Sequence, residues 1–371
     1  RTPQKDGILM GIRPGYKQTE IGVIPEDWKI DYIGNHCSIT TGKRNTQDSE
    51  VNGVYPFFVR SQVVEHINSY SFDGEAVLTA GDGVGTGKVF HYINGRFDLH
   101  QRVYCLRDFS NAVDGYYFFL FFKHRFFARI QQFTAKTSVD SVRLEMISKM
   151  PIALPPRDEQ IAISKALSGI DSLITSLEKL IEKKKLIKQG VMQELLTGKR
   201  RLPGFGGEWE TKRLGDLFSL QYGKPMKESD RVESGVIPVY GSNGVVGYTF
   251  TELTSCPTII VGRKGAAGSV HHSPTGCWPI DTTFYIEFDD YTESLFYYYL
   301  LQCAGLDRIK SDSAVPGLNR ADAYALMITV PSKEERIQIA EILLSIDQEI
   351  TYLTNSLDKH KLLKQAMMQE L

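Results

Sequence analysis

The sequence predicts an α+β protein with two globular domains, separated by two long α-helices that form an antiparallel intramolecular coiled coil. Three observations predict it: the chain of 371 residues is long enough for two domains, it repeats itself, and each repeat ends in a long heptad pattern. The expected order is a domain at residues 1–154, a helix at 155–201, a domain at 202–330 and a helix at 331–371. Residues 1–14 are set aside as an extension or tag.

The internal repeat is visible in two places. The stretch that begins at Trp28, WKIDYIGNHCSITTGK, corresponds to the stretch that begins at Trp209, WETKRLGDLFSLQYGK. Residues 155–195 align without gaps to residues 331–371, and about nineteen of forty-one positions are identical. Similarity of this kind within one chain indicates two copies of one structural unit.

Each of the two helical segments carries a narrow apolar stripe whose residues step by four and three positions, as in the seam of a coiled coil. The stripe residues are Ile163, Leu167, Ile170, Ile174, Leu177 and Ile181 in the first segment, and Ile339, Leu343, Ile346, Ile350, Leu353 and Leu357 in the second. A helix of about forty residues is about 60 Å long and needs a partner. We interpret the two as one antiparallel coiled coil; the alternative is that each helix packs on its own domain.

The globular stretches mix short strand-like runs, such as residues 54–59, 257–261 and 283–288, with turn-forming Gly and Asn. Aromatic stretches at residues 116–127 and 296–301 occupy matching places in the two copies. We expect these aromatic side chains to build the two cores, with base stacking as the alternative role.

Composition argues against several classes of protein. No apolar run approaches the roughly 18 residues that span a bilayer, and no basic-then-apolar leader opens the chain, so we expect a cytoplasmic protein without membrane contact. The five cysteines include no Cys-x-x-Cys pair, so the sequence predicts neither a zinc site nor a disulfide framework. The net charge of −1 means that a DNA-binding role would require basic groups to gather locally.

Catalytic motifs are not found in the sequence. The Gly-rich stretch GDGVGTGK at residues 81–88 departs from a phosphate-binding loop, because Asp82 replaces the first glycine and Val89 the Ser or Thr. The sequence also has no His-Glu-x-x-His pair and no Gly-x-Ser-x-Gly elbow. A related turn, GRKGAAG at residues 262–268, places the feature in the repeated unit, where it brings backbone close to phosphate or to another strand, or serves only as a turn.

The sequence resembles the specificity subunits of type I restriction-modification systems along essentially its whole length. The resemblance is carried by the domain duplication and by four motifs: TEIGVIPEDW at residues 19–28, LPPRDEQ at 154–160, MQELLTGK at 192–199 and PGFGGEW at 203–209. It implies two target recognition domains, each reading one half of a bipartite asymmetric site in double-stranded DNA. It also implies that the helices set the spacing and dock two methyltransferase (modification) subunits, that restriction subunits join through the complex, and that this chain is non-catalytic and needs no cofactor.

Candidate DNA-contacting residues are sought on matching loops, since Lys and Arg hold phosphates and polar side chains read base edges. In the first domain they are Lys43, Arg44, Arg60, Ser61, Gln62, Lys88, His91, Arg96, His100, Gln101, Arg102 and Arg143. In the second domain they are Lys224, Ser242, Asn243, Arg263, Lys264, His271, Asn319 and Arg320. The alternative for each residue is a solvated surface group without a role in binding.

The charge count limits how DNA would be held. Residues 28–150 carry 14 basic against 12 acidic side chains, whereas residues 209–330 carry 10 against 14. We therefore expect much of the phosphate affinity of a complex to come from methyltransferase partners. Two other functions stay open at this point: the recognition subunit of a type II restriction-modification system, distinguished by whether cleavage needs ATP, and a protein-binding coiled-coil scaffold.

Overall fold

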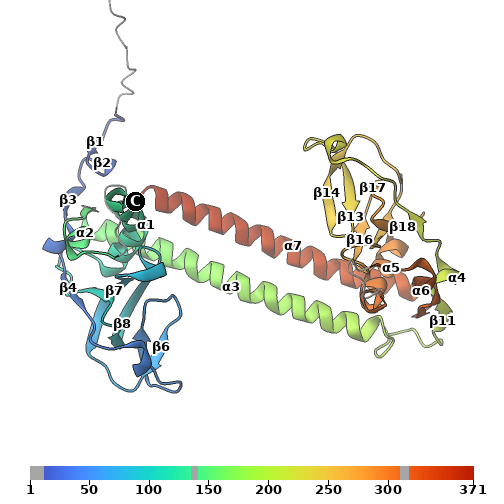
Figure 1. The fold of residues 1–371 in the computed structure, drawn as a ribbon, viewed down its shortest axis with the longest axis horizontal. Helices are drawn as coiled ribbons and strands as arrows, with labels where there is room; N and C mark the ends of the chain where they lie inside the picture. The colour runs from blue at the N-terminus through green and yellow to red at the C-terminus, as the bar shows by residue number, and fades with distance from the viewer. Residues whose placement is uncertain (1–11, 135–140, 310–316) are drawn as a thin grey trace, which may run out of the picture. The chain divides into compact units, whose positions relative to one another are not determined.

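The computed structural model describes residues 12–134, 141–309 and 317–371, so most of the stretch set aside as an extension or tag lies outside the described residues. The chain divides into two compact units, residues 1–175 with 358–371, and residues 176–357. The two long helices, α3 (Arg157–Leu195) and α7 (Lys333–Gln369), each contribute to both units (Figure 1).

The first unit is built on a six-stranded sheet in the order β4-β9-β7-β8-β5-β6, in which β5 and β8 are parallel and the other neighbours antiparallel. Its strands are β4 (Ser38–Thr41), β5 (Tyr55–Phe58), β6 (Glu65–Ile67), β7 (Phe72–Ala80), β8 (Phe90–Leu99) and β9 (Val103–Arg107). Two antiparallel pairs belong to the same unit: β1 (Tyr16–Thr19) with β2 (Gly22–Pro25), and β3 (Lys29–Tyr32) with β10 (Pro151–Leu154). Short 3-10 turns are η1 (Ile33–Asn35), η2 (Thr46–Asp48) and η3 (Gly83–Gly85).

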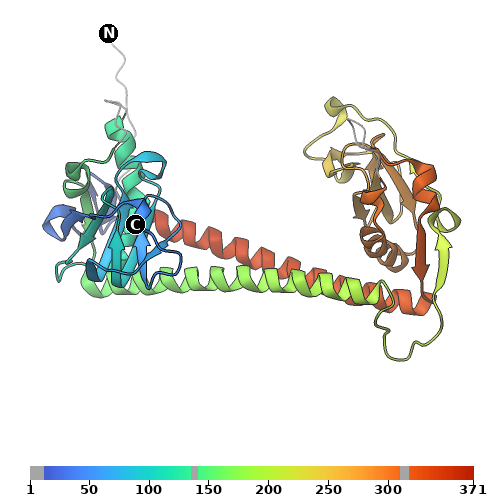
Figure 2. The same cartoon turned by 60° about the horizontal axis from the view of Figure 1, so that its bottom comes forward.

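The core of the first unit lies between this sheet and helix α1 (Gly115–Thr134), which packs against β7 and β8 (Figures 1 and 2). The short helix α2 (Leu144–Ser148) completes the unit. The aromatic side chains of α1 form the centre of this core. Five of them have an exposed fraction of 0%: Tyr117, Phe118, Phe121, Phe122 and Phe126. This burial confirms the prediction that the stretch builds the core. Residues three or four positions apart lie on the same face of a helix, so these rings share the inner face of α1.

The second unit contains a four-stranded sheet in the order β12-β18-β15-β16 and a three-stranded sheet in the order β14-β13-β17. The strands are β12 (Gln221–Tyr222), β13 (Ile237–Gly241), β14 (Gly244–Thr249), β15 (Thr258–Gly262), β16 (Val270–Ser273), β17 (Trp278–Pro279) and β18 (Thr283–Glu287). The antiparallel pair β11 (Glu210–Arg213) and β19 (Met327–Val330) matches the β3-β10 pair of the first unit. The remaining elements are α4 (Leu214–Leu217), η4 (Glu228–Asp230), α5 (Tyr291–Cys303), η5 (Leu306–Arg308) and α6 (Arg320–Ala325).

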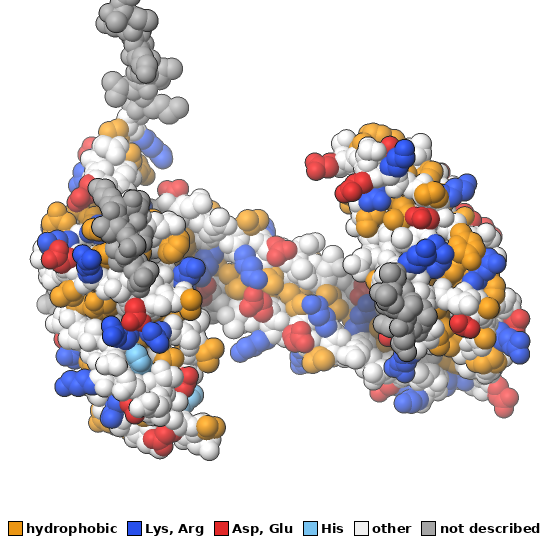
Figure 3. All heavy atoms as spheres, in the orientation of Figure 1, with side chains coloured by type: hydrophobic (Ala, Val, Ile, Leu, Met, Phe, Trp, Pro, Cys, Tyr) orange, Lys and Arg blue, Asp and Glu red, His pale blue; other side chains and the backbone are white. Residues whose placement is uncertain are grey.

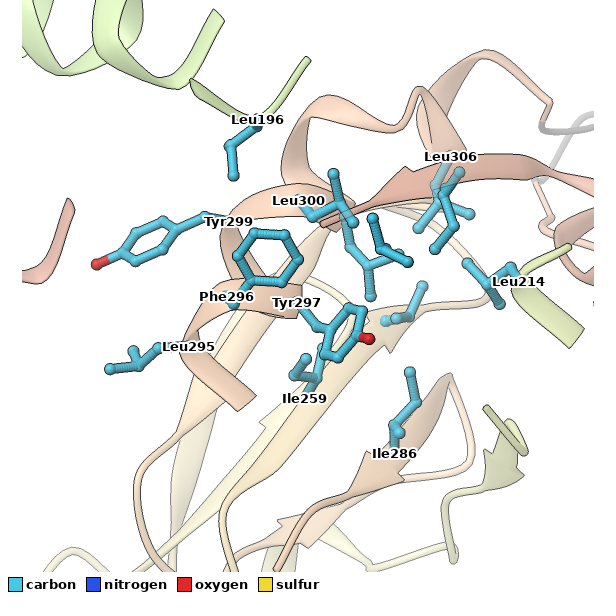
Figure 4. Packing of buried hydrophobic residues seen from close by; sticks show 14 of the residues in the cluster. Leu196, Leu214, Ile259, Ile286, Leu295, Phe296, Tyr297, Tyr299, Leu300 and Leu306 are labelled. Carbon is cyan, nitrogen blue, oxygen red and sulfur yellow. The ribbon is translucent and has the colours of Figure 1, made fainter. Parts of the chain in front are cut away.

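The core of the second unit gathers around α5, the second aromatic stretch. Phe296 is 0% and Tyr299 1% exposed, and both pack in one cluster with strand residues such as Ile259 (Figure 4). Leu196, the first residue after α3, joins the same cluster and lies beside α5 in Figure 4. The core prediction is therefore confirmed in this unit too.

The two long helices carry the predicted apolar stripe, and all twelve of its residues are buried or half-buried. In the second unit, Lys184 pairs with Glu349 at 2.7 Å and Lys188 with Asp347 at 2.6 Å, so the two helical segments there run in opposite directions. The first helix is shorter than expected: it ends at Leu195 instead of residue 201, because the chain turns at Gly198, whose φ of +69° is left-handed.

Candidate DNA interface

In the first unit, the loop after β5 rests on the Gly-rich turn between β7 and β8. The imidazole Nε2 of His91 lies 3.2 Å from the carbonyl oxygen of Ser61, within hydrogen-bonding distance. A Cβ added to Gly85 would lie 2.4 Å from the carbonyl oxygen of Arg60, so only glycine fits there. Burial lowers the pKa of His91 and so favours the neutral ring. Its contact with the Ser61 carbonyl supports the loop.

The second unit holds its corresponding loop in the same way. Nε2 of His271 lies 3.1 Å from the carbonyl oxygen of Ser242, and the hydroxyl of Ser269 donates to the same oxygen. Gly265 has a φ of +78°, close to the +76° of Gly83 in the first unit. The Gly-rich stretches are thus equivalent turns, and the close packing of loop on turn is a property of the repeat.

A third segment meets the Gly-rich turn in both units. The backbone N–H of Val142 donates to the carbonyl of Gly81 at 2.7 Å, and that of Leu318 donates to the carbonyl of Arg263 at 2.8 Å. These bonds place the next residues, Arg143 in the first unit and Asn319 in the second, beside the turn.

A fourth segment is fixed by a glycine that precedes each candidate lysine. A Cβ on Gly42 would lie 1.9 Å from the carbonyl oxygen of Leu99, and one on Gly223 would lie 2.1 Å from that of Ile280. Such distances exclude any side chain, so the Gly-Lys pairs of the sequence repeat mark a close backbone approach. The lysines that follow, Lys43 and Lys224, are exposed.

Asp82 organises the charges of the first unit, although sequence reasoning assigned it no role in binding. Nη1 of Arg60 lies 2.8 Å from Oδ1 of Asp82, and Nη1 of Arg102 lies 3.6 Å from Oδ2. The two arginine side chains remain 47% and 63% exposed. One carboxylate therefore draws together two cations that are far apart in the chain, and both still reach solvent.

Two candidates of the first unit are engaged in its framework. Arg44 donates from Nε to Oδ2 of Asp98 at 3.2 Å and from Nη2 to the Ser69 hydroxyl at 2.8 Å, and the Asp98 side chain is 1% exposed. His100 is 6% exposed, and its Nδ1 accepts the backbone N–H of Arg102 at 3.0 Å. Burial lowers the pKa of His100, in keeping with a neutral ring that shapes the turn after β8.

The remaining candidates of the first unit have different surroundings. Gln62, Lys88 and Gln101 are exposed. Nε2 of Gln62 donates to the Phe90 carbonyl at 3.4 Å, which attaches its loop to the start of β8. Arg96 belongs to another set of contacts: it pairs with Asp73 at 3.1 Å, and its guanidinium lies 4.8 Å from the centre of the Tyr70 ring.

In the second unit, Tyr222 joins two candidate arginines and was missed from the sequence. The guanidinium of Arg263 lies 5.3 Å from the centre of the Tyr222 ring and that of Arg320 lies 5.0 Å from it, while Tyr222 is 50% exposed. The signal that could have found it is its place directly before the repeated Gly-Lys pair. Arg and an exposed aromatic ring together are a combination suited to nucleic acid.

The other candidates of the second unit lie on the same loops. Lys264 and Asn243 are exposed. The side-chain oxygen of Asn319 accepts the N–H of Ala321 at 2.9 Å and so caps helix α6. Arg263 also donates from its guanidinium to the Asp281 carbonyl, at 2.6 and 3.2 Å.

The face drawn in Figure 3 shows no continuous basic field. On the face drawn in Figure 3, Lys and Arg side chains are interspersed with Asp and Glu on each unit. Within the described residues, no group of three or more His, Cys, Asp or Glu side chains is arranged to hold a metal ion. Among those residues there is also no helix with the length and apolarity needed to cross a membrane.

The fold thus contains one α+β unit twice, with matching loops that present polar and basic side chains. A family model described as the type I restriction modification DNA specificity domain matches residues 25–189 and again residues 206–360. The chain belongs to this family, and the resemblance seen in its sequence is confirmed.

Known relatives agree with this membership. The chain is 28% identical over 253 residues to the type I restriction enzyme MjaVIII specificity subunit of Methanocaldococcus jannaschii; the match covers 62% of this chain and only 59% of that relative's length. It is 23% identical to the putative MjaX specificity subunit of the same organism, with 90% of each chain covered. A crystal structure of the S subunit from M. genitalium has the same fold, with a TM-score of 0.71, 18% identity, and 92% and 95% of the two chains covered.

Proposed function

We propose that this chain is the non-catalytic subunit that selects the DNA sequence for a type I restriction-modification complex, each unit reading one half of a bipartite asymmetric site. The observation that carries the proposal is that the specificity domain occurs twice. Each copy also holds its exposed loops through equivalent contacts, such as His91 to Ser61 and His271 to Ser242. In this proposal the recognition domains are residues 1–154 and 202–330.

Within each unit we assign different tasks to the candidate residues. Exposed side chains such as Arg60, Gln62 and Asn243 contact DNA, because they extend from loops that the framework fixes in place. His91 and His271 hold those loops. A few local cations are sufficient for each unit if the methyltransferase subunits supply the larger share of phosphate contacts.

Helices α3 and α7 form an antiparallel intramolecular coiled coil that sets the separation of the two half-sites. The buried stripe and the ion pairs Lys184 to Glu349 and Lys188 to Asp347 support this arrangement. One extra heptad in both helices adds about 10 Å, which corresponds to about three base pairs of duplex. The methylated site of such a variant should have a longer spacer between unchanged half-sites; an unchanged spacer would refute the ruler.

The same helices dock two methyltransferase subunits, through which restriction subunits join. Support comes from apolar side chains that are exposed at equivalent positions of the repeat: Leu186 and Ile187 are 60% and 42% exposed, and Leu362 and Leu363 are 67% and 48% exposed. Leu186→Ser and Leu362→Ser should each remove one methyltransferase subunit from the complex, as measured by native mass spectrometry. Leu173→Ser is the control, since Leu173 is 41% exposed on α3 but has no apolar counterpart on α7.

The test of the proposed function is to express this chain with the modification subunit of the same genome and to map methylated adenines by single-molecule sequencing. We expect a split motif that disappears without this chain. Arg60→Ala with Gln62→Ala should alter only one half of the motif, and Asn243→Ala with Lys264→Ala only the other. Lys149→Ala, on a side chain 69% exposed, is the matched control for loss of charge. A folded pair that produces no chain-dependent methylation would overturn the proposal.

A further inference from the structure

Each unit carries two adjacent exposed valines at the end of the loop assigned to DNA contact. Val63 and Val64 are 73% and 36% exposed, and Val245 and Val246 are 48% and 39% exposed. Apolar side chains in water cost free energy in proportion to the area that stays exposed. Single exposed apolar residues are common on protein surfaces, but an adjacent pair that recurs in both copies of a repeat indicates a ligand that covers it.

The strand register shows that the two valine pairs are structurally equivalent. Strands β5 and β13 each have an antiparallel neighbour after the loop, β6 or β14, and a parallel neighbour, β8 or β17. The third residue of each strand, Phe57 or Val239, pairs with Glu65 or Gly247, and the two connections have equal length. In both units the valines are the two residues directly before that partner. The same apolar pair thus occurs twice at one position of the fold.

In the second unit a β-bulge accounts for the exposure of both valines. Successive side chains of a regular strand point to opposite faces of the sheet. Between the neighbouring strands β13 and β14 (Figure 1), the register jumps from Gly247 to Val245, which leaves Val246 without a partner. Such an extra residue breaks the alternation and re-aims the side chains. Gly241 gives this residue room, since a Cβ there would lie 3.0 Å from Cγ1 of Val246.

The valines belong to loops that are held in place and carry a cation. In the first unit the Ser61 hydroxyl donates to the Val63 carbonyl at 2.9 Å, and Arg60, whose side chain is 47% exposed, precedes this contact in the loop. In the second unit the loop at Ser242 packs on the Gly-rich turn that carries the exposed Lys264. A small apolar surface next to a positive charge is therefore common to both units.

Thymine is the base whose chemistry fits such a surface. Among the base edges in the major groove of DNA, the 5-methyl group of thymine is the apolar one. A stable protein interface buries about 800 Å² on each partner, far more than two valines present. The neighbouring cation adds the attraction to phosphate that positions a loop on DNA.

We infer that each valine pair is a specificity-determining contact that reads the 5-methyl group of a thymine in its half-site. This inference rests on the proposed function and adds the kind of base contact that the two units share. Because the pairs occupy equivalent positions, each half-site contains such a thymine. The polar side chains of the same loops read the other bases.

The experiment measures how tightly the complex of this chain with its modification subunit binds duplexes that carry the mapped motif. Each thymine of the motif is replaced in turn by deoxyuridine, which lacks only the 5-methyl group and pairs in the same way. We expect one position in each half-site at which the affinity falls about fourfold, the loss that corresponds to one buried methyl group. Replacement at the other thymines should leave the affinity unchanged.

Serine variants connect the uracil effect to the valines, because serine removes both methyl groups of valine. A serine pair in the first unit should abolish the uracil effect in one half-site, and a serine pair in the second unit should abolish it in the other. The variants are Val63→Ser with Val64→Ser, and Val245→Ser with Val246→Ser.

Matched controls are Val54→Ser and Val236→Ser. These valines are 72% and 77% exposed and directly precede β5 and β13, at the opposite end of each strand from the loop. Their variants should keep the affinity of the wild-type complex and the full uracil effect. Thermal melts followed by circular dichroism check that all serine variants are folded.

Three results would overturn the inference: a half-site without thymine, a half-site in which uracil changes no affinity, or a uracil effect that survives the serine pair of the same unit. A complex that selects no motif at all would remove the proposed function, and this inference with it. A motif that is bound equally well with uracil removes the inference alone.

Discussion

Replacing Arg44 by alanine should lower the free energy of unfolding of the first unit. It should not remove a direct contact with DNA. The Asp98 side chain is 1% exposed and receives Nε of Arg44 at 3.2 Å. Removing the partner of a fully buried charge costs about 3–5 kcal/mol. Here the cost is smaller, because the Arg44 side chain is 40% exposed and Asp98 keeps hydrogen bonds from the Ser71 hydroxyl at 3.0 Å and the Leu99 N–H at 2.9 Å. We expect a loss of about 1–3 kcal/mol in the free energy of unfolding.

Urea denaturation of the full chain, followed by circular dichroism, measures this loss as a lower midpoint with an unchanged slope. Arg102→Ala is the matched control, since Arg102 is 63% exposed and lies 3.6 Å from its carboxylate partner. A surface ion pair of that kind contributes at most about 1 kcal/mol. Methylation of the DNA site is then measured at a temperature where both variants are folded. This measurement separates an effect on stability from an effect on DNA binding.

The reasoning would be refuted if Arg44→Ala unfolded at the same urea concentration as the wild-type chain and yet lost recognition of one half-site. That result would make Arg44 a DNA contact, as its place in the sequence first indicated. If Arg44→Ala is destabilised but keeps its recognition when folded, Arg44 is a framework residue.

Three further changes are predicted from the packing and the titration of single groups. Gly42→Ala should lose about 1–3 kcal/mol in urea denaturation, because its Cβ would lie 1.9 Å from the Leu99 carbonyl oxygen. Gly169→Ala should raise the free energy of unfolding by up to about 1 kcal/mol in the same assay, because Gly169 lies inside α3 and its added Cβ would meet nothing within 4 Å apart from the helix's own backbone. A lower free energy of unfolding would argue against a helix at this position. Burial lowers the pKa of His272 from 6.5 to about 4. The unfolded chain therefore binds a proton first as the pH falls, and the second unit should lose up to about 3 kcal/mol between about pH 6.5 and pH 4. His272→Gln should flatten the dependence of the urea midpoint on pH in that window, and an equally steep dependence would exclude His272 as its source.

Much of the candidate interface could be predicted from the sequence because it is repeated there. The Gly-Lys pairs, the Gly-rich turns and the paired His91 and His271 all stand at corresponding places in the two copies. A repeat in the sequence does not show which residue pairs with each charged side chain. Asp82 holds two arginines, and Asp98 engages Arg44, only because the folded sheet and its loops bring together residues that are far apart in the chain.

The sequence by itself determined the duplication, the α+β content, the two aromatic cores and the two long helices with their apolar stripe. These features depend on local periodicity and on similarity between segments, which can be read without coordinates. Only the tertiary structure decided which candidate side chains are free to reach a ligand and which are part of the framework. It also showed that Glu159 is exposed where its repeat partner Glu335 is buried. The physical reason is that exposure depends on what the rest of the fold places beside a residue, so two glutamates at equivalent positions differ in exposure although each accepts a hydrogen bond from the equivalent tryptophan.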